Sequence, residues 1–134
     1  MASDGVAGIP YSLRPDVVAT VLDHGALLLD LESKYFYLLN PSGWSLTQLF
    51  EDGSTFDHAV ERCRAWGAAD EDLEGVRSSL QTLLREGLLE ETAHPANIEG
   101  DAPSEWRPTT IEKQAEPLQR VIVSAFDPSI PLAE

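Results

Sequence analysis

Short apolar runs separated by polar turns dominate the first third of the chain. Residues 17–22, 26–31 and 35–39 are rich in Val, Leu, Tyr and Phe, which is the composition of β-strands. The polar triplets 23–25 and 32–34 between these runs are short enough for hairpin turns. The pattern therefore predicts three consecutive strands that form an antiparallel sheet.

The repeat of apolar positions changes from strand-like to helical after Asn40. Asn is a favoured N-cap, and Pro41 would occupy the first helical turn, where its missing N–H is not needed. We expect this first helix to end at Glu51. A second helix is predicted between a cap at Ser54 or Thr55 and a glycine stop at position 67.

A third helix is predicted between an acidic cap at Asp70 and a stop at Gly87. Its apolar positions follow the 3.6-residue repeat and are Leu73, Val76, Leu80, Leu83 and Leu84. Three strands followed by three helices predict an α+β fold with a three-stranded antiparallel sheet, of the winged helix-turn-helix-like kind.

The composition divides the chain into four parts. Residues 1–15 contain two Gly and two Pro and are interpreted as an N-terminal arm, and residues 16–93 carry the predicted strands and helices. Residues 94–117 are rich in Pro and acidic residues, which is typical of a linker. Residues 118–134 return to a strand-forming pattern and are interpreted as a C-terminal extension.

The charge balance argues against a nucleic-acid partner. The chain of 134 residues has 9 Lys and Arg against 23 Asp and Glu, a formal net charge of −14. Phosphate contacts require clustered basic residues, and the sequence has no such cluster. The single cysteine, Cys63, excludes an intrachain disulfide, and no apolar run is long enough for a membrane helix, so a cytoplasmic protein is expected.

Candidate catalytic chemistry is sparse. His24, His58 and His94 fall in a turn, a helix and the linker, and neither they nor Cys63 show metal-ligand spacing. No phosphate-binding loop, nucleophile elbow or zinc-hydrolase helix is present. We therefore expect no enzyme activity, no cofactor and no metal, and we interpret Cys63 as a small buried apolar residue.

Basic and polar residues recur every four positions on the third predicted helix, at Arg77, Gln81 and Arg85. One interpretation is a solvated helix face with ordinary ion pairs. The other is a basic rim beside a groove between the third strand and the third helix. The sequence pattern alone leaves both open.

Two blocks of sequence carry a resemblance to a known family. The block GALLLDLESKYFYLLNPSGWSLTQLF at residues 25–50, followed by LQTLLREGLLEE at residues 80–91, resembles the PqqD-like family. Members of this family are also called RiPP recognition elements, because they recognise the precursors of ribosomally made, modified peptides. The resemblance spans about 75 of the 134 residues.

The resemblance implies a non-catalytic adaptor that binds the leader of a precursor peptide. The leader would add as an antiparallel strand to the third strand, with its side chains beside the third helix. The adaptor would present the leader to a radical SAM enzyme, a cyclodehydratase or a leader peptidase. The implied peptide-binding residues are Lys34, Tyr35, Phe36, Tyr37, Leu38, Leu39, Val76, Arg77, Leu80, Gln81, Leu84 and Arg85.

The C-terminal extension departs from the minimal family pattern. Residues 118–132 combine a strand-forming run with an aromatic residue beside an acid, which many leaders also have. One hypothesis is that this tail occupies the peptide groove, either in the same chain or in a domain-swapped homodimer. The alternatives for the whole chain are a winged-helix nucleic-acid binder and a purely structural interaction module.

Overall fold

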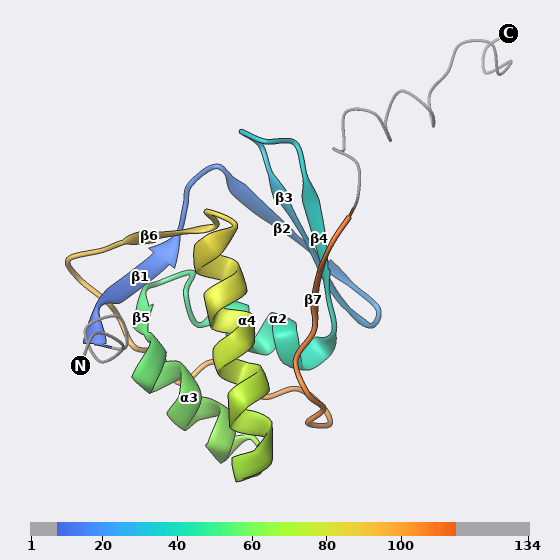
Figure 1. Cartoon of the computed structure of the whole chain (residues 1–134), viewed down its shortest axis with the longest axis vertical. Coiled ribbons are helices and arrows are strands. Elements are labelled where there is room, and N and C mark those ends of the chain that lie inside the picture. Colours follow the sequence, from blue (N-terminus) through green and yellow to red (C-terminus); the bar gives the residue numbers. More distant parts are fainter. Residues whose placement is uncertain (1–7, 115–134) are drawn as a thin grey trace, which may run out of the picture.

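The computed structural model describes residues 8–114, which fold into two antiparallel sheets and three helices (Figure 1). The predicted α+β class is confirmed. The strands are β1 (Pro10–Leu13), β2 (Val17–Leu22), β3 (Gly25–Asp30), β4 (Phe36–Leu39), β5 (Ser54–Thr55), β6 (Leu89–Glu91) and β7 (Ile111–Lys113). The helices are α2 (Pro41–Gln48), α3 (Phe56–Ala65) and α4 (Leu73–Arg85), with a single 3-10 turn, η1 (Asp70–Asp72), before α4.

The larger sheet has four strands in the order β2-β3-β4-β7, where the sequence predicted three. β2, β3 and β4 are the three predicted strands, joined by hairpins as expected. The fourth strand, β7, comes from the stretch that was interpreted as a linker and pairs with β4. It escapes the sequence pattern because it is three residues long and two of its members, Glu112 and Lys113, are charged.

A second, smaller sheet has the order β5-β1-β6 and was not predicted. β1 lies in the stretch interpreted as an N-terminal arm, and it pairs with strands of two and three residues. Such short strands carry too few positions for a period-2 pattern to be visible. The pairing ties the start of the described chain to the segment just before α3 and to the segment just after α4.

Two of the three helices begin at predicted caps. The Asn40 side chain accepts a hydrogen bond from the backbone N–H of Gly43, and the Thr55 side chain accepts one from His58. The third helix does not: Asp70 opens the 3-10 turn η1, and α4 begins at Leu73 with Asp72 at its N-cap and no capping hydrogen bond from a side chain. α2 ends earlier than expected, at Gln48, because the chain tightens into a turn in which the N–H of Phe50 bonds the carbonyl of Thr47.

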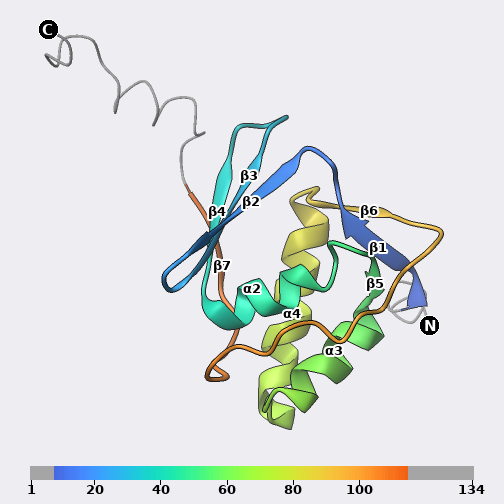
Figure 2. The ribbon, with the colours of Figure 1, turned by 180° about the vertical axis from the view of Figure 1, so that it is seen from behind.

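The hydrophobic core lies where the helices pack against the sheets. Leu28 and Tyr37 from the larger sheet, Leu46 from α2 and Leu80 from α4 are among its almost fully buried side chains. Of the apolar stripe predicted for α4, four members are buried and Leu84 is half-buried. Figures 1 and 2 show α4 lying between α3 and β7, with α2 behind α4 in the view of Figure 1 and in front of it in Figure 2.

The stretch from residue 92 to 110, which from residue 94 on belongs to the predicted linker, runs along the helices before it enters β7 (Figures 1 and 2). His58 Nε2–H donates to the carbonyl of Ile98, and Arg62 Nε–H donates to the carbonyl of Glu99. The indole N–H of Trp106 donates to Asp72 at 3.1 Å. These contacts make the stretch part of the folded unit.

The predicted strand in residues 118–134 lies outside the described residues. Within residues 8–114, no helix has both the length and the apolar character needed to cross a membrane.

Candidate functional site

The outer edge of β4, which was predicted to accept a peptide, is paired with β7. The pairing is antiparallel, with Tyr37 opposite Lys113, Leu38 opposite Glu112 and Leu39 opposite Ile111. Just beyond this register, the N–H of Gln114 donates to the carbonyl of Phe36 at 2.9 Å. A segment of the chain itself therefore adds to β4 as an extra strand.

Asn40 holds the start of this added strand. Its Oδ1 accepts from the N–H of Gly43 at 2.8 Å and from the N–H of Thr110 at 3.0 Å, and its Nδ2 donates to the carbonyl of Pro108 at 2.8 Å. The backbone N–H of Asn40 also donates to the carbonyl of Thr110 at 3.3 Å. One residue thus caps α2 and anchors the approach to β7.

Gly43 allows the chain to come this close to α2. A Cβ atom at position 43 would lie 2.6 Å from the carbonyl oxygen of Thr110, which is closer than packed atoms approach. Next to it, Ser42 Oγ accepts a hydrogen bond from the N–H of Arg107 at 2.9 Å. The first turn of α2 is therefore shaped to receive residues 107–110.

Helix α4 forms the other wall of the site. Ser79 Oγ lies 2.7 Å from Thr109 Oγ1, and Glu86 Oε1 lies 3.0 Å from Lys113 Nζ. The hydroxyl of Tyr37, on β4, donates to the same Glu86 oxygen at 3.2 Å. The added strand is thus held by its backbone on β4 and by its side chains on α4.

The ionisable side chains at this site influence one another's pKa values. The hydrogen bond from Lys113 is the main cause that lowers the pKa of Glu86, while burial of the Tyr37 ring, with Glu86 nearby, raises the pKa of that phenol to about 12. Lys113 Nζ also lies 4.3 Å from the centre of the Tyr35 ring, a cation–π distance. The Lys113 ammonium therefore lies between a carboxylate and an aromatic face.

The structure places the six predicted strand residues at and just before β4. Lys34 is exposed in the turn before it, with a positive φ of 72°, and Tyr35 is half-buried. Tyr37 and Leu39 point into the core, whereas Phe36 and Leu38 are half-buried.

The six predicted helix residues are divided between the core and the surface of α4. Val76 and Leu80 are fully buried in the core, and Leu84 is half-buried. Arg77, Gln81 and Arg85 are exposed. Within residues 8–114, no hydrogen bond or ion pair joins these three side chains to β4, and Arg85 instead contacts Thr82 and Glu86.

Helix geometry explains why the exposed residues of α4 lie away from β7. Successive residues turn by about 100°, so Arg77 lies about 200° around the helix from Ser79, which contacts the segment before β7. The residues that face the added strand are Ser79 and Glu86. Neither stands out in the sequence, because a lone Ser and an acid in a helix are ordinary solvent-facing residues.

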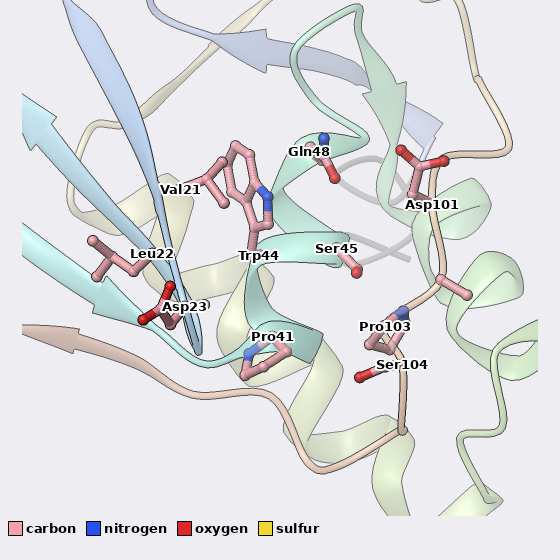
Figure 3. A pocket seen from close by; sticks show the side chains of 12 residues that line it. Val21, Leu22, Asp23, Pro41, Trp44, Ser45, Gln48, Asp101, Pro103 and Ser104 are labelled. Carbon is pink, nitrogen blue, oxygen red and sulfur yellow. The ribbon is translucent and has the colours of Figure 1, made fainter.

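A separate hollow of about 320 Å³ lies between the end of the β2–β3 hairpin, α2 and residues 101–104 (Figure 3). Figure 3 shows the Trp44 ring beside Val21, with Asp23 and Asp101 on different sides of the opening. The hollow shares no residue with β4 or β7, and it contains no Lys or Arg. Its chemistry would suit a side chain with an apolar stem and a cationic end.

A metal-ligating cluster or a reactive thiol would be a further kind of site in the described part of the chain. No group of three or more His, Cys, Asp or Glu side chains there could hold a metal ion. Cys63 is fully buried in the core, and burial raises the pKa of its thiol to about 12, so it is a poor nucleophile.

Comparison with known proteins found no matching family model, no matching curated protein and no matching solved structure.

Proposed function

We propose that the chain is a non-catalytic adaptor that binds an extended peptide at the β4 edge. The ligand would be the leader of a ribosomally made precursor peptide, and the adaptor would present it to a modifying enzyme or a leader peptidase. We further infer that β2, β3, β4 and the three helices act as a winged helix-turn-helix-like unit and that the protein works in the cytoplasm.

The pairing of β7 with β4 is the observation that carries this proposal. Strand addition requires an accessible edge whose backbone groups accept a partner, together with a neighbouring wall that reads alternate side chains. The backbone groups of the β4 edge do accept such a partner, since they pair in register with Ile111–Lys113, and this segment must leave before the edge is accessible to another peptide. Helix α4 provides the neighbouring wall, since Ser79 and Glu86 contact side chains of residues 109 and 113.

The occupied edge implies competition between β7 and the leader. β7 has three residues, and two of them, Glu112 and Lys113, are exposed. Because β7 is tethered in the same chain, its effective concentration at the β4 edge is on the order of millimolar. A leader replaces β7 only if its longer strand makes enough additional contacts with the edge to overcome this advantage. In this proposal, β7 keeps the edge covered until a leader with more contacts replaces it.

A second copy of the chain could supply the same strand. The pairing depends on backbone groups and register, which are identical in another copy, so a domain-swapped homodimer through residues 111–113 is compatible with the proposal. Size-exclusion chromatography at several concentrations would detect it as a dimer that does not dissociate rapidly on dilution.

A proline at position 112 offers a full-length test. In an antiparallel pair alternate residues face the partner, and the hydrogen bonds at Thr110 and Gln114 place the N–H of Glu112 toward β4. Glu112→Pro removes this N–H donor and is incompatible with a regular paired strand. Glu112→Gln keeps the N–H and allows the strand conformation. Because Glu112 is exposed, neither substitution removes a side chain from the hydrophobic core.

The measurement is a titration of both variants with the leader of a candidate precursor peptide, by fluorescence anisotropy. We expect the Glu112→Pro variant to bind the leader about 10-fold more tightly than the Glu112→Gln variant. This factor corresponds to a loss of about 1.4 kcal/mol in the free energy with which β7 pairs with β4 and competes with the leader. Equal affinities would show that β7 does not compete. If neither variant bound the leader, the peptide-binding function would be wrong and a purely structural module would remain.

A further inference from the structure

The side chains that surround β7 indicate which kind of peptide the β4 edge would accept. Strand residues alternate between faces, and Thr109, Ile111 and Lys113 lie on the same side as one another. Thr109 contacts Ser79, and Lys113 contacts Glu86, so this side is the one that faces α4. Ile111 is half-buried and packs against the core between these two contacts.

The position of Lys113 has the most specific surroundings. Its ammonium lies 3.0 Å from Glu86 Oε1 and 4.3 Å from the centre of the Tyr35 ring. Glu86 is only 20% exposed, and its other cationic neighbour, Arg85, is 4.0 Å away and largely in solvent. Lys113 is therefore the main partner of a carboxylate that has already lost most of its water.

Removal of Lys113 leaves this carboxylate poorly satisfied. Glu86 would keep the hydrogen bond from the Tyr37 hydroxyl at 3.2 Å and the distant Arg85. A partly buried charge that loses its partner costs free energy, so any strand that replaces β7 binds better if it brings a cation to this place. An acid there would face Glu86 directly and be rejected.

We propose that β7 is a template for the true ligand, and that the β4 edge selects extended segments with the pattern hydroxyl–x–aliphatic–x–Lys. The Lys would occupy the place of Lys113, the aliphatic residue that of Ile111, and the Ser or Thr that of Thr109. This inference rests on the proposed function, since it names the ligand class of the same site.

The order of importance within the pattern follows from the contacts. The Lys position discriminates most, because it combines an ion pair with a cation–π contact. The aliphatic position contributes burial. The hydroxyl position adds one neutral hydrogen bond to Ser79, which is worth less than a charged one.

The test uses full-length Glu112→Pro protein as the receptor and two synthetic six-residue peptides as probes. One peptide has the sequence of residues 109–114, TTIEKQ, and the other has Glu in place of the Lys. Binding is followed by chemical-shift changes of the β4 backbone amides in ¹⁵N-labelled receptor. We expect the Lys peptide to bind about 10-fold more tightly than the Glu peptide.

Substitution at Glu86 checks that this carboxylate causes the preference. In the receptor that also carries Glu86→Gln, which keeps the shape of the side chain, the preference for Lys should disappear. With Glu86→Lys it should reverse. Circular dichroism shows whether each receptor is folded. If the receptor with Glu86→Lys does not fold, the receptor with Glu86→Gln is sufficient for the test.

The remaining outcomes separate this inference from the function on which it rests. Equal binding of both peptides would overturn the Lys selection and leave strand addition intact. If neither peptide bound while the leader did, the template would be wrong and the adaptor function would stand. If the leader also failed to bind, both proposals would be wrong.

Discussion

At the scale of single residues, Asp30 is the buried carboxylate of the described chain that most depends on a partner. Its side chain is 5% exposed, and Arg14 donates to both of its oxygens at 3.4 Å. Burial alone would raise its pKa, but the hydrogen bonds from the Glu32 N–H and from Arg14 outweigh burial and hold the pKa below the ordinary value. The pair therefore stabilises the fold above the ordinary carboxyl pKa, and that contribution is lost as the pH falls through the lowered value.

Removal of Arg14 should be costly. Arg14→Met leaves Asp30 buried without its cation and also removes the hydrogen bond to the carbonyl of Gly87, so we expect a loss of about 2 kcal/mol in the free energy of unfolding. Urea unfolding at pH 7 measures it. The matched control is Arg64→Met, whose pair with Asp70 is exposed and should cost less than about 0.5 kcal/mol. Similar losses for the two variants would contradict the role given to Asp30.

Burial also determines how the protein responds to alkali. It raises the pKa of the Cys63 thiol and of the Tyr37 phenol to about 12 each. A raised pKa means that the neutral form is favoured in the folded state, so this stability is complete below the ordinary value and is lost as the pH rises toward 12.

We therefore expect the free energy of unfolding to fall between about pH 9 and pH 12. Thermal unfolding across this range measures the loss, and Cys63→Ala with Tyr37→Phe should flatten the decline. The thiol of the native protein should also be slow to react with a thiol reagent at pH 8 and should become reactive in denaturant. Rapid reaction in the native state would show that Cys63 is not buried in solution.

At the scale of elements, substitutions at two glycines test the pairing of β3 with β4 and the packing of α4. Gly25 begins β3 with φ of 128°, and a Cβ there would lie 1.9 Å from the carbonyl oxygen of Leu39. Gly75 lies in α4, and a Cβ there would meet open space. The same substitution should therefore have opposite effects at the two positions.

Gly25→Ala should destabilise the protein by about 3 kcal/mol, because it combines a strained backbone with a clash against a neighbouring strand. Gly75→Ala should stabilise it by about 0.5–1 kcal/mol, because Ala favours helix and nothing obstructs its methyl group. Chemical unfolding of the two variants beside the parent protein provides both values. A stabilising Gly25→Ala would mean that β3 and β4 do not approach as described.

At the scale of the whole molecule, the stretch after β6 completes the core. Ile98, Trp106 and Ile111 are partly buried against it, and a Cβ at Gly100 would lie 2.6 Å from the side chain of Leu49. A chain that ends at Glu91 therefore loses a wall of its hydrophobic core as well as β7.

We expect that shortened chain to unfold with a free energy lower by on the order of 3 kcal/mol or more, from the apolar surface it exposes. Differential scanning calorimetry would show a clearly lower melting temperature. Trp106→Ala in the full chain should reproduce part of the loss, since it removes the largest of these side chains and its hydrogen bond to Asp72. An unchanged melting temperature would mean that the stretch is only loosely attached, as a linker would be.

The local pattern of the sequence was sufficient for the central elements. The apolar runs and turns in residues 17–39 predicted β2, β3 and β4, and Asn40 and Thr55 marked the starts of two helices. These features depend on neighbours within a few positions, which is the range over which backbone preferences and caps act. The α+β class followed from their order.

The tertiary structure decided where the short strands pair and which residues surround the β4 edge. β7 has three residues and no distinctive composition, and it is a strand only because β4 offers an unpaired edge and Asn40 holds its approach. Likewise, Glu86 matters because folding brings Lys113 and Tyr37 to it from 27 residues after and 49 residues before in the chain. Such contacts are made by long-range packing, whose partners no local pattern of residues specifies.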